Sequence, residues 1–126
     1  MQLVWQRAEG ALFPTRVEPD GVVVAERKIN KSFVLFPDRL LEDWPPLRPE
    51  EVTVEHLGLI LAHHPELILL GCGPRWHLPP AAVRAHCLKQ NVGLEVMDNA
   101  AAARTYTVLA GENRRVAVGF LIAPQA

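Results

Sequence analysis

The sequence has little of several features that mark specialised classes of protein. Its 13 basic and 14 acidic side chains nearly cancel, to a net charge of −1, which argues against nucleic acid or an acidic membrane surface as a partner. No apolar run approaches the roughly 20 residues of a membrane-spanning helix. What remains is an ordinary globular composition of 126 residues, 49% of them hydrophobic, enough to bury a core.

Cysteine is also scarce, and catalytic motifs are missing. Cys72 and Cys87 form neither a disulfide framework nor a metal-ligand motif, so we expect no metal and no cofactor. Two lone thiols are typical of a reducing compartment, and residues 1–10 lack the apolar stretch of a secretory signal, so we expect a cytoplasmic protein. No nucleophile elbow, His-Glu-x-x-His or Walker motif occurs, so no catalytic residue is assigned and a non-enzyme is favoured.

The apolar patterning predicts an α/β fold. Short early strands separated by turn residues indicate an N-terminal antiparallel meander, and the later strands alternate with helices, which predicts a βαβ unit with a right-handed crossover. We expect a mixed central sheet with helices on both faces, in one domain over residues 1–126 whose last few residues fray. The expected strands are 12–17, 22–25, 32–36, 67–70, 94–97 and 115–122, and the expected helices are 54–63, 79–90 and 100–110.

Between the meander and the first helix, residues 37–51 are rich in proline and charge and are predicted to be a connection. Trp44 lies within it. A tryptophan in such a loop usually folds back onto the core, so we interpret Trp44 as a packing anchor.

The most distinctive stretch is Leu67 to Gly73. The apolar run Leu67–Leu70 predicts a strand covered on both faces, and Gly71-Cys72-Gly73 follows at its carboxyl end, where open α/β sheets bind ligands. The turn is similar to the start of a dinucleotide fingerprint, but the third glycine is missing. The alternative is that both glycines serve only the turn, and that Cys72 is a small buried residue and not a nucleophile.

A second group of candidates follows the next predicted strand: Glu95, Asp98, Arg104 and Tyr106. Either Asp98 or the following Asn99 is expected to cap a helix. One hypothesis is a polar pocket at the strand ends in which Arg104 holds an anion. The other, which we favour, is an ion pair between Arg104 and a carboxylate that fixes helix to sheet.

Three motifs together carry a resemblance to a known family: Leu69–Gly73, Gly93–Asp98 and Ala103–Tyr106. The chain is similar to a family of domains of unknown function that includes a mitochondrial respiratory complex I assembly factor and an adipogenesis-associated cytosolic protein. The resemblance implies a compact α/β domain without known catalytic activity. It also implies protein contacts during assembly of the NADH:ubiquinone oxidoreductase as the role of the mitochondrial branch.

The chain departs from the family pattern at three positions. Cys72 stands where the family often has Thr, Ala103 where it often has Cys, and Thr107 where it often has Asn. These departures argue against a site that needs that cysteine or asparagine. The lack of an Arg- and Ser-rich leader favours a bacterial-type cytosolic protein.

Two hypotheses for the function result. The first is a non-enzymatic protein-interaction module linked to assembly of respiratory complex I. The alternative is a small-molecule or anion-binding domain, with or without an activity, whose ligand lies at the strand ends beside Gly71, Cys72 and Gly73.

Overall fold

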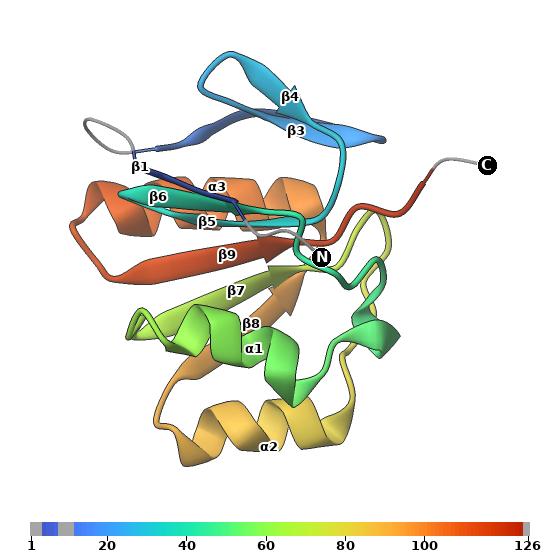
Figure 1. The fold of residues 1–126 in the computed structure, drawn as a ribbon, viewed down its shortest axis with the longest axis vertical. Helices are drawn as coiled ribbons and strands as arrows, with labels where there is room; N and C mark the ends of the chain where they lie inside the picture. Colours follow the sequence, from blue (N-terminus) through green and yellow to red (C-terminus); the bar gives the residue numbers. More distant parts are fainter. Residues whose placement is uncertain (1–3, 8–11, 125–126) are drawn as a thin grey trace.

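The structure is a computed structural model and describes residues 4–7 and 12–124. The remaining residues lie outside the described part. They include most of residues 1–10, which lack a secretory signal pattern, and the last two residues of the tail that is expected to fray. The strands are β1 (Val4–Arg7), β2 (Pro14–Glu18), β3 (Gly21–Val24), β4 (Arg27–Ile29), β5 (Phe33–Phe36), β6 (Arg39–Glu42), β7 (Leu67–Gly71), β8 (Gly93–Met97) and β9 (Val116–Phe120). The helices are α1 (Val54–Leu61), α2 (Ala81–Lys89) and α3 (Asn99–Gly111), with a short 3-10 turn, η1, at Pro49–Glu51 (Figure 1).

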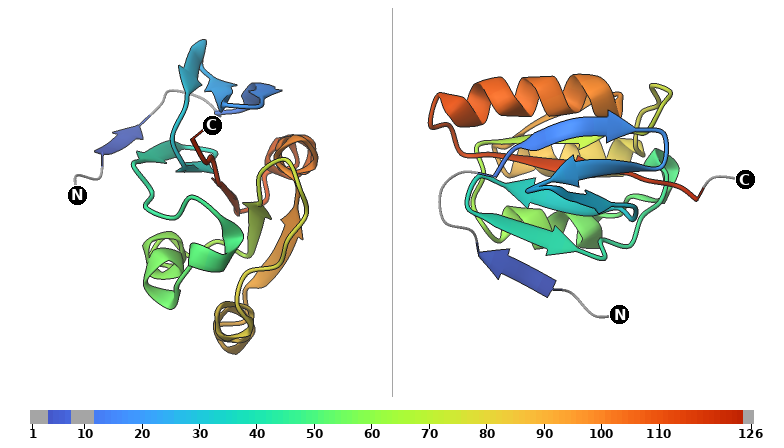
Figure 2. Two further views of the ribbon diagram at one scale, coloured as in Figure 1. Left: turned by 90° about the vertical axis from the view of Figure 1, so that its right-hand side faces the viewer. Right: turned by 90° about the horizontal axis from the view of Figure 1, so that it is seen from above.

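The larger sheet is mixed and is built around β7. Its strand order is β1-β6-β5-β9-β7-β8, with β7 parallel to both β8 and β9 and with β5 antiparallel to β9 and β6. Every residue of β7 is buried, because α1 and α2 lie on one side of the sheet and α3 lies on the other (Figures 1 and 2). The predicted α/β class, mixed sheet and βαβ unit are confirmed.

The N-terminal meander is confirmed as a separate three-stranded antiparallel sheet, in the order β2-β3-β4. Its third strand, however, is β4, and the segment expected to complete it, Phe33–Phe36, is β5 of the larger sheet. The turn between β3 and β4 consists of Ala25 and Glu26, which both have positive φ angles, of 51° and 65°. Glycine or asparagine usually marks such a turn, and neither residue type is present here to indicate it.

The predicted connection over residues 37–51 also contains a strand. After the two residues Pro37 and Asp38 the chain turns back, so that β6 pairs with β5 and Phe36 lies opposite Arg39. The strand was missed because it is only four residues long and stands among prolines. In the larger sheet β6 lies between β1 and β5, and β5 lies between β6 and β9.

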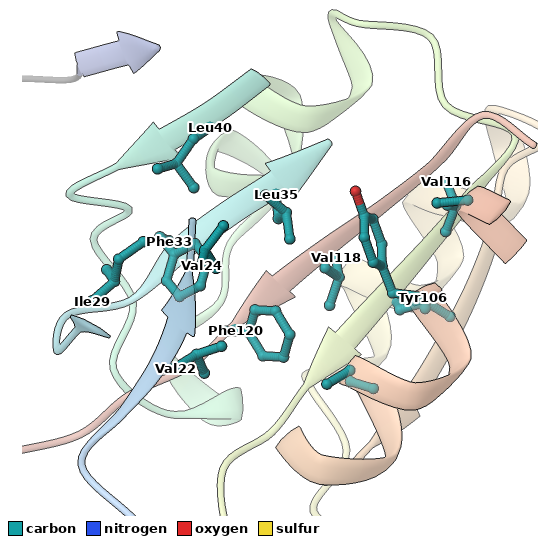
Figure 3. Packing of buried hydrophobic residues seen from close by; sticks show 14 of the residues in the cluster. Val22, Val24, Ile29, Phe33, Leu35, Leu40, Tyr106, Val116, Val118 and Phe120 are labelled. Atoms are coloured by element: carbon teal, nitrogen blue, oxygen red, sulfur yellow. The ribbon is translucent and has the colours of Figure 1, made fainter. Parts of the chain in front are cut away.

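The larger sheet separates two hydrophobic cores. The core between the sheet, α3 and the small sheet includes Phe33, Tyr106 and Phe120 (Figure 3), and the Phe33 and Phe120 ring centroids are 5.2 Å apart. The core on the other face includes Trp44 together with residues of α1 and α2. The two cores explain why β7 and β9 are apolar on both faces.

Trp44 is the packing anchor that the sequence predicted. Its side chain is buried, and the indole Nε1 donates to the carbonyl of His56 in α1 at 3.2 Å. The ring lies against Gly119 of β9, where a Cβ atom would come within 2.7 and 2.8 Å of two ring carbons. The loop is therefore held to the sheet at a position that only glycine fits.

Replacing Gly119 by alanine should destabilise the protein, because the new methyl group meets the ring of Trp44. We expect a loss of about 1–3 kcal/mol in the free energy of unfolding, as for an overpacked core. Gly58 in α1 is the matched control, since no atom lies within 4 Å of a Cβ built there, and Gly58→Ala should gain about 0.4–1 kcal/mol. Urea denaturation of both variants measures the difference, and equal effects would contradict this account of Gly119.

Candidate functional site

The carboxyl ends of β7 and β8 meet at one edge of the sheet, and the chain leaves them toward opposite faces. After β7 it crosses to α2, and after β8 it enters α3, on the other side (Figure 1). This arrangement is the switch point at which open α/β sheets bind ligands. The residues that meet there are called the strand-end site below, and they are Gly71, Cys72, Gly73, Asp98 and Asn99.

Asn99 is the central residue of the strand-end site. Its Oδ1 accepts a hydrogen bond from the backbone N–H of Gly73 at 3.1 Å, and its Nδ2 donates to the carbonyl of Leu121 at 3.1 Å. The side chain is buried, so these bonds replace bonds to water. Asn99 thereby joins the turn after β7 to the end of β9, across the start of α3.

Both glycines of the Gly71-Cys72-Gly73 turn have a structural explanation. A Cβ atom at Gly71 would collide with Oδ1 of Asn99 and approach the ring of Phe120 to 3.1 Å. Gly73 has a φ angle of 97°, which side chains other than glycine rarely adopt, and its carbonyl accepts from the backbone N–H of Asn99 at 3.0 Å. The two glycines therefore admit the Asn99 side chain and shape the backbone around it.

Cys72 lies in the turn but is not arranged as a nucleophile. The side chain is buried, and its Sγ donates to the carbonyl of Arg75 at 3.1 Å. Burial raises the pKa of the Cys72 thiol, whereas a reactive cysteine needs a lowered pKa. This geometry is that of a small buried residue, which is the alternative to a nucleophile.

Asp98, and not Asn99, caps α3. Its Oδ1 accepts from the backbone N–H of Ala101 at 2.8 Å, which satisfies one of the open donors of the first turn. The sequence left this choice open, and it did not assign the buried clamp to Asn99. The sequence does contain one indication of this role. Asn99 directly follows the capping residue after β8, and the Gly71-Cys72-Gly73 turn follows the neighbouring strand β7.

The other candidates are not brought together. Glu95 is exposed because β8 is an edge strand, Arg104 is exposed on α3, and no ion pair joins Arg104 to Glu95 or Asp98 within residues 12–124. Tyr106 belongs to the core, where its hydroxyl donates to the carbonyl of Leu12 at 2.9 Å and burial raises the pKa of its phenol. The favoured ion pair is therefore not formed in this structure.

The turn at Gly73 and Pro74 lies between two hollows. One, of about 380 Å³, is bordered by Glu18, Asp98 and Asn99. The other, of about 420 Å³, is bordered by charged and aromatic residues that include Arg48, Glu50, Arg75, Trp76 and His77. Both volumes suit small molecules.

Two further properties of the described residues bear on function. They contain no group of three or more His, Cys, Asp or Glu side chains placed to hold a metal ion. They also contain no helix with the length and apolar character needed to cross a membrane.

The fold and the strand-end site define a class: a mixed-sheet α/β domain in which an asparagine clamps two strand ends beside a glycine turn. The chain belongs to the family of proteins of unknown function DUF498/DUF598, whose model matches residues 14–121. The resemblance to a family of unknown function is thus confirmed.

Solved structures of relatives have the same fold. An NMR structure of a Xanthomonas campestris protein is 39% identical, with a TM-score of 0.77 over 94% of this chain and 85% of that one. The NMR structure of a Bordetella pertussis protein, described as a Mth938-like domain, is 27% identical, with a TM-score of 0.80 over 100% of this chain and 95% of that one.

A curated relative matches a shorter stretch. The "13 kDa major membrane protein" of Francisella tularensis subsp. holarctica is 37% identical over 67 residues. Those residues are 53% of this chain and 54% of that protein, so the match spans about half the length of each.

Removing the Asn99 side chain should destabilise the fold, because the N–H of Gly73 and the carbonyl of Leu121 lose their buried partner. We expect Asn99→Ala to cost about 1–3 kcal/mol in the free energy of unfolding. In Asn99→Asp the donor to Leu121 is lost and a buried carboxyl is introduced, whose folded pKa lies above its unfolded value. Relative to the parent chain, the stability of Asn99→Asp is then highest below pH ~4 and falls as the pH rises.

Asp98→Asn is the matched control, since asparagine caps helices about as well as aspartate. Denaturation at pH 4 and pH 7 compares the two exchanges. A stability difference between Asn99→Asp and the parent chain that is the same at both pH values would contradict the buried clamp.

The thiols of Cys72 and Cys87 should react slowly in the folded protein. Both are buried, and burial raises the pKa of each, so little thiolate is present and access is poor. At pH 7.5 (about one unit below the ordinary thiol pKa) we expect modification by a disulfide reagent to be at least about tenfold slower than in denaturant. Equal rates in both conditions would show that the thiols are accessible.

Proposed function

We propose that the chain is a non-enzymatic protein-interaction module whose contact surface is the outer face of α2 and the loop before it. The observation that carries the proposal is the exposure of large apolar side chains there. Leu88 of α2 is 78% exposed, Trp76 is 62% exposed and Leu78 is 37% exposed. Trp76 and Leu78 precede the first turn of α2 and Leu88 lies in its last turn, so the exposed side chains are spread along the helix. Large exposed aromatic and apolar side chains favour a protein partner.

The backbone next to this surface is also suited to a protein contact. β8 is the edge strand of the larger sheet beside α2, and Trp76 lies over that edge, donating from Nε1 to the carbonyl of Val96 at 3.1 Å. The indole covers one open backbone group and leaves its ring exposed. A partner that packs on Trp76 gains a large rigid side chain at low entropic cost.

The polar groups of the strand-end site support a non-enzymatic role. Asn99 and Cys72 direct their hydrogen bonds at neighbouring backbone, and Oδ1 of Asp98 caps α3. Catalytic groups instead keep an atom directed at the substrate.

The partner class comes from the family resemblance. The proposal names assembly proteins of respiratory complex I as partners, and it puts the module in the cytoplasm, because Cys72 and Cys87 are both free thiols, as in a reducing compartment. The membrane-protein name of the Francisella relative describes that protein, and association with a membrane complex is compatible with it.

A second candidate function is binding of a small molecule at the strand ends. It is favoured by the two hollows beside Gly73 and Pro74. In that case ligand would raise the melting temperature by mass action, and Arg48→Ala in the more charged hollow would reduce the shift.

The interaction surface is tested by placing a charge in it. Leu88→Glu should reduce recovery of partners in a pull-down from respiring cells about tenfold, because a buried unpaired carboxylate costs well over 1.4 kcal/mol at an interface. Val108→Glu is the matched control, since Val108 is 60% exposed on α3, away from α2. Both variants should keep the melting temperature of the parent chain.

Equal recovery by the two variants would contradict the surface on α2. Recovery of partners that include no complex I subunit or assembly protein, together with normal complex I in a deletion strain, would remove the link to complex I and leave the interaction. No partner at all, with a melting temperature raised by nucleotides, phosphates or carboxylates, would favour the second candidate.

A further inference from the structure

A pocket of about 360 Å³ lies at the end of the sheet opposite the strand-end site. It forms where the β5–β6 hairpin, the end of α1 and the loop between α3 and β9 meet. Three arginines, Arg39, Arg114 and Arg115, line it together with His63. These four residues define the arginine pocket.

Arg39 is held rigidly at one side of the arginine pocket. Its Nε and Nη2 donate to the two carboxylate oxygens of Asp38 at 3.2 and 3.0 Å, and its Nη1 donates to Nδ1 of His63 at 2.8 Å. The imidazole therefore accepts at Nδ1 and is neutral, and burial, reinforced by Arg39, lowers its pKa. The ring of His63 also packs edge-on against Phe36, with centroids 5.2 Å apart.

Among the described residues, the side chains of Arg114 and Arg115 are hydrogen-bonded only through their Nε atoms. The Nε of Arg114 donates to Glu66 at 3.2 Å, and the Nε of Arg115 donates to the carbonyl of His64 at 3.2 Å. Arg115 forms no ion pair within the part of the chain that the structure describes. The terminal nitrogens of these two guanidinium groups are thus available to a ligand.

The charge around the pocket is positive although the whole chain carries −1. Three guanidinium groups stand against the two carboxylates of Asp38 and Glu66, an excess of one positive charge. Guanidinium groups bind carboxylates and phosphates through paired, charge-assisted hydrogen bonds.

The rest of the lining is largely apolar. Phe36, Pro37, Pro65 and Val116 border the same pocket, so an apolar group can lie beside the arginines. The volume falls in the range of small-molecule sites, which combine an apolar lining with a few polar groups.

We propose that the arginine pocket binds a small organic oxyanion, a carboxylate or phosphate monoester that carries an apolar group. The anion lies against Arg114 and Arg115, and the apolar group lies over Phe36 and Pro65. Arg39, fixed by Asp38 and His63, adds positive potential without moving. This site is separate from both the strand-end site and the surface of α2.

The competing explanation is that the arginines serve the fold alone. α1 and α3 both end at this side of the sheet, and cations stabilise the carboxyl ends of helices. The bond from Arg115 to the carbonyl of His64, just beyond α1, is of this kind. In that case no ligand binds.

Titration of the labelled protein with phenyl phosphate and with benzoate, followed by NMR at constant ionic strength, tests the proposal. We expect saturable shifts at Arg39, His63 and residues 114–116 with at least one of the two probes, which also separates phosphate from carboxylate. Arg115→Gln should weaken binding about tenfold, the effect of losing a charge-assisted bond. Arg104→Gln, a change at an exposed arginine of α3 outside the pocket, should leave binding within about twofold.

Three results would overturn the proposal. One is the absence of saturable shifts at the pocket with both probes. Another is equal weakening by Arg104→Gln and Arg115→Gln, which would mean that net charge alone attracts the probe. The third is equal binding of benzamide, which has the ring of benzoate without its charge.

Discussion

The hydrogen bonds of Asn99 to Gly73 and Leu121 are the constraint on which the strand-end region depends. They are buried, and they add to the backbone hydrogen bonds from Leu121 to Gly71 and from Asn99 to Gly73 that join the same three segments. The neighbouring residues follow from them: Gly71 has no side chain because the Asn99 amide occupies that space, and Asp98 is left to cap α3. The Gly71-Cys72-Gly73 turn, whose sequence is similar to a ligand-binding loop, thus makes structural contacts with Asn99.

The same constraint explains why the sequence predicted some features and missed others. The apolar run Leu67–Leu70 is local and unambiguous, so a strand buried on both faces was predicted, and the βαβ unit followed from the order of elements. The partners of Asn99 are 26 and 22 residues away, and no local pattern reports a contact over that distance. Likewise, the turn at Ala25 and Glu26 depends on positive φ angles that neither residue type indicates.

Strand order accounts for the pair that did not form. Glu95 was expected to need a partner if a helix covered its face, but β8 is an edge strand and the carboxylate is solvated. Arg104, on α3, is solvated as well. Two exposed charges gain little from pairing, so neither holds the other. The candidates nearest to Asn99 at the strand ends do lie together: Gly71, Cys72, Gly73 and Asp98. Their role as a ligand site stays a prediction.

The hydrogen bonds of Asn99 and of the Cys72 thiol are made within the fold, and the proposed functions also involve the protein surface. Two regions of that surface are unlike an ordinary solvated face. On α2, Leu88 is more exposed than Val108 on α3, and it lies on the side of the sheet where Trp76 covers the open edge. At the opposite end of β7 and β9, no carboxylate of the described residues bonds to the terminal nitrogens of Arg114 and Arg115. No residue of α2 borders the arginine pocket, so a substitution in either region leaves the residues of the other unchanged.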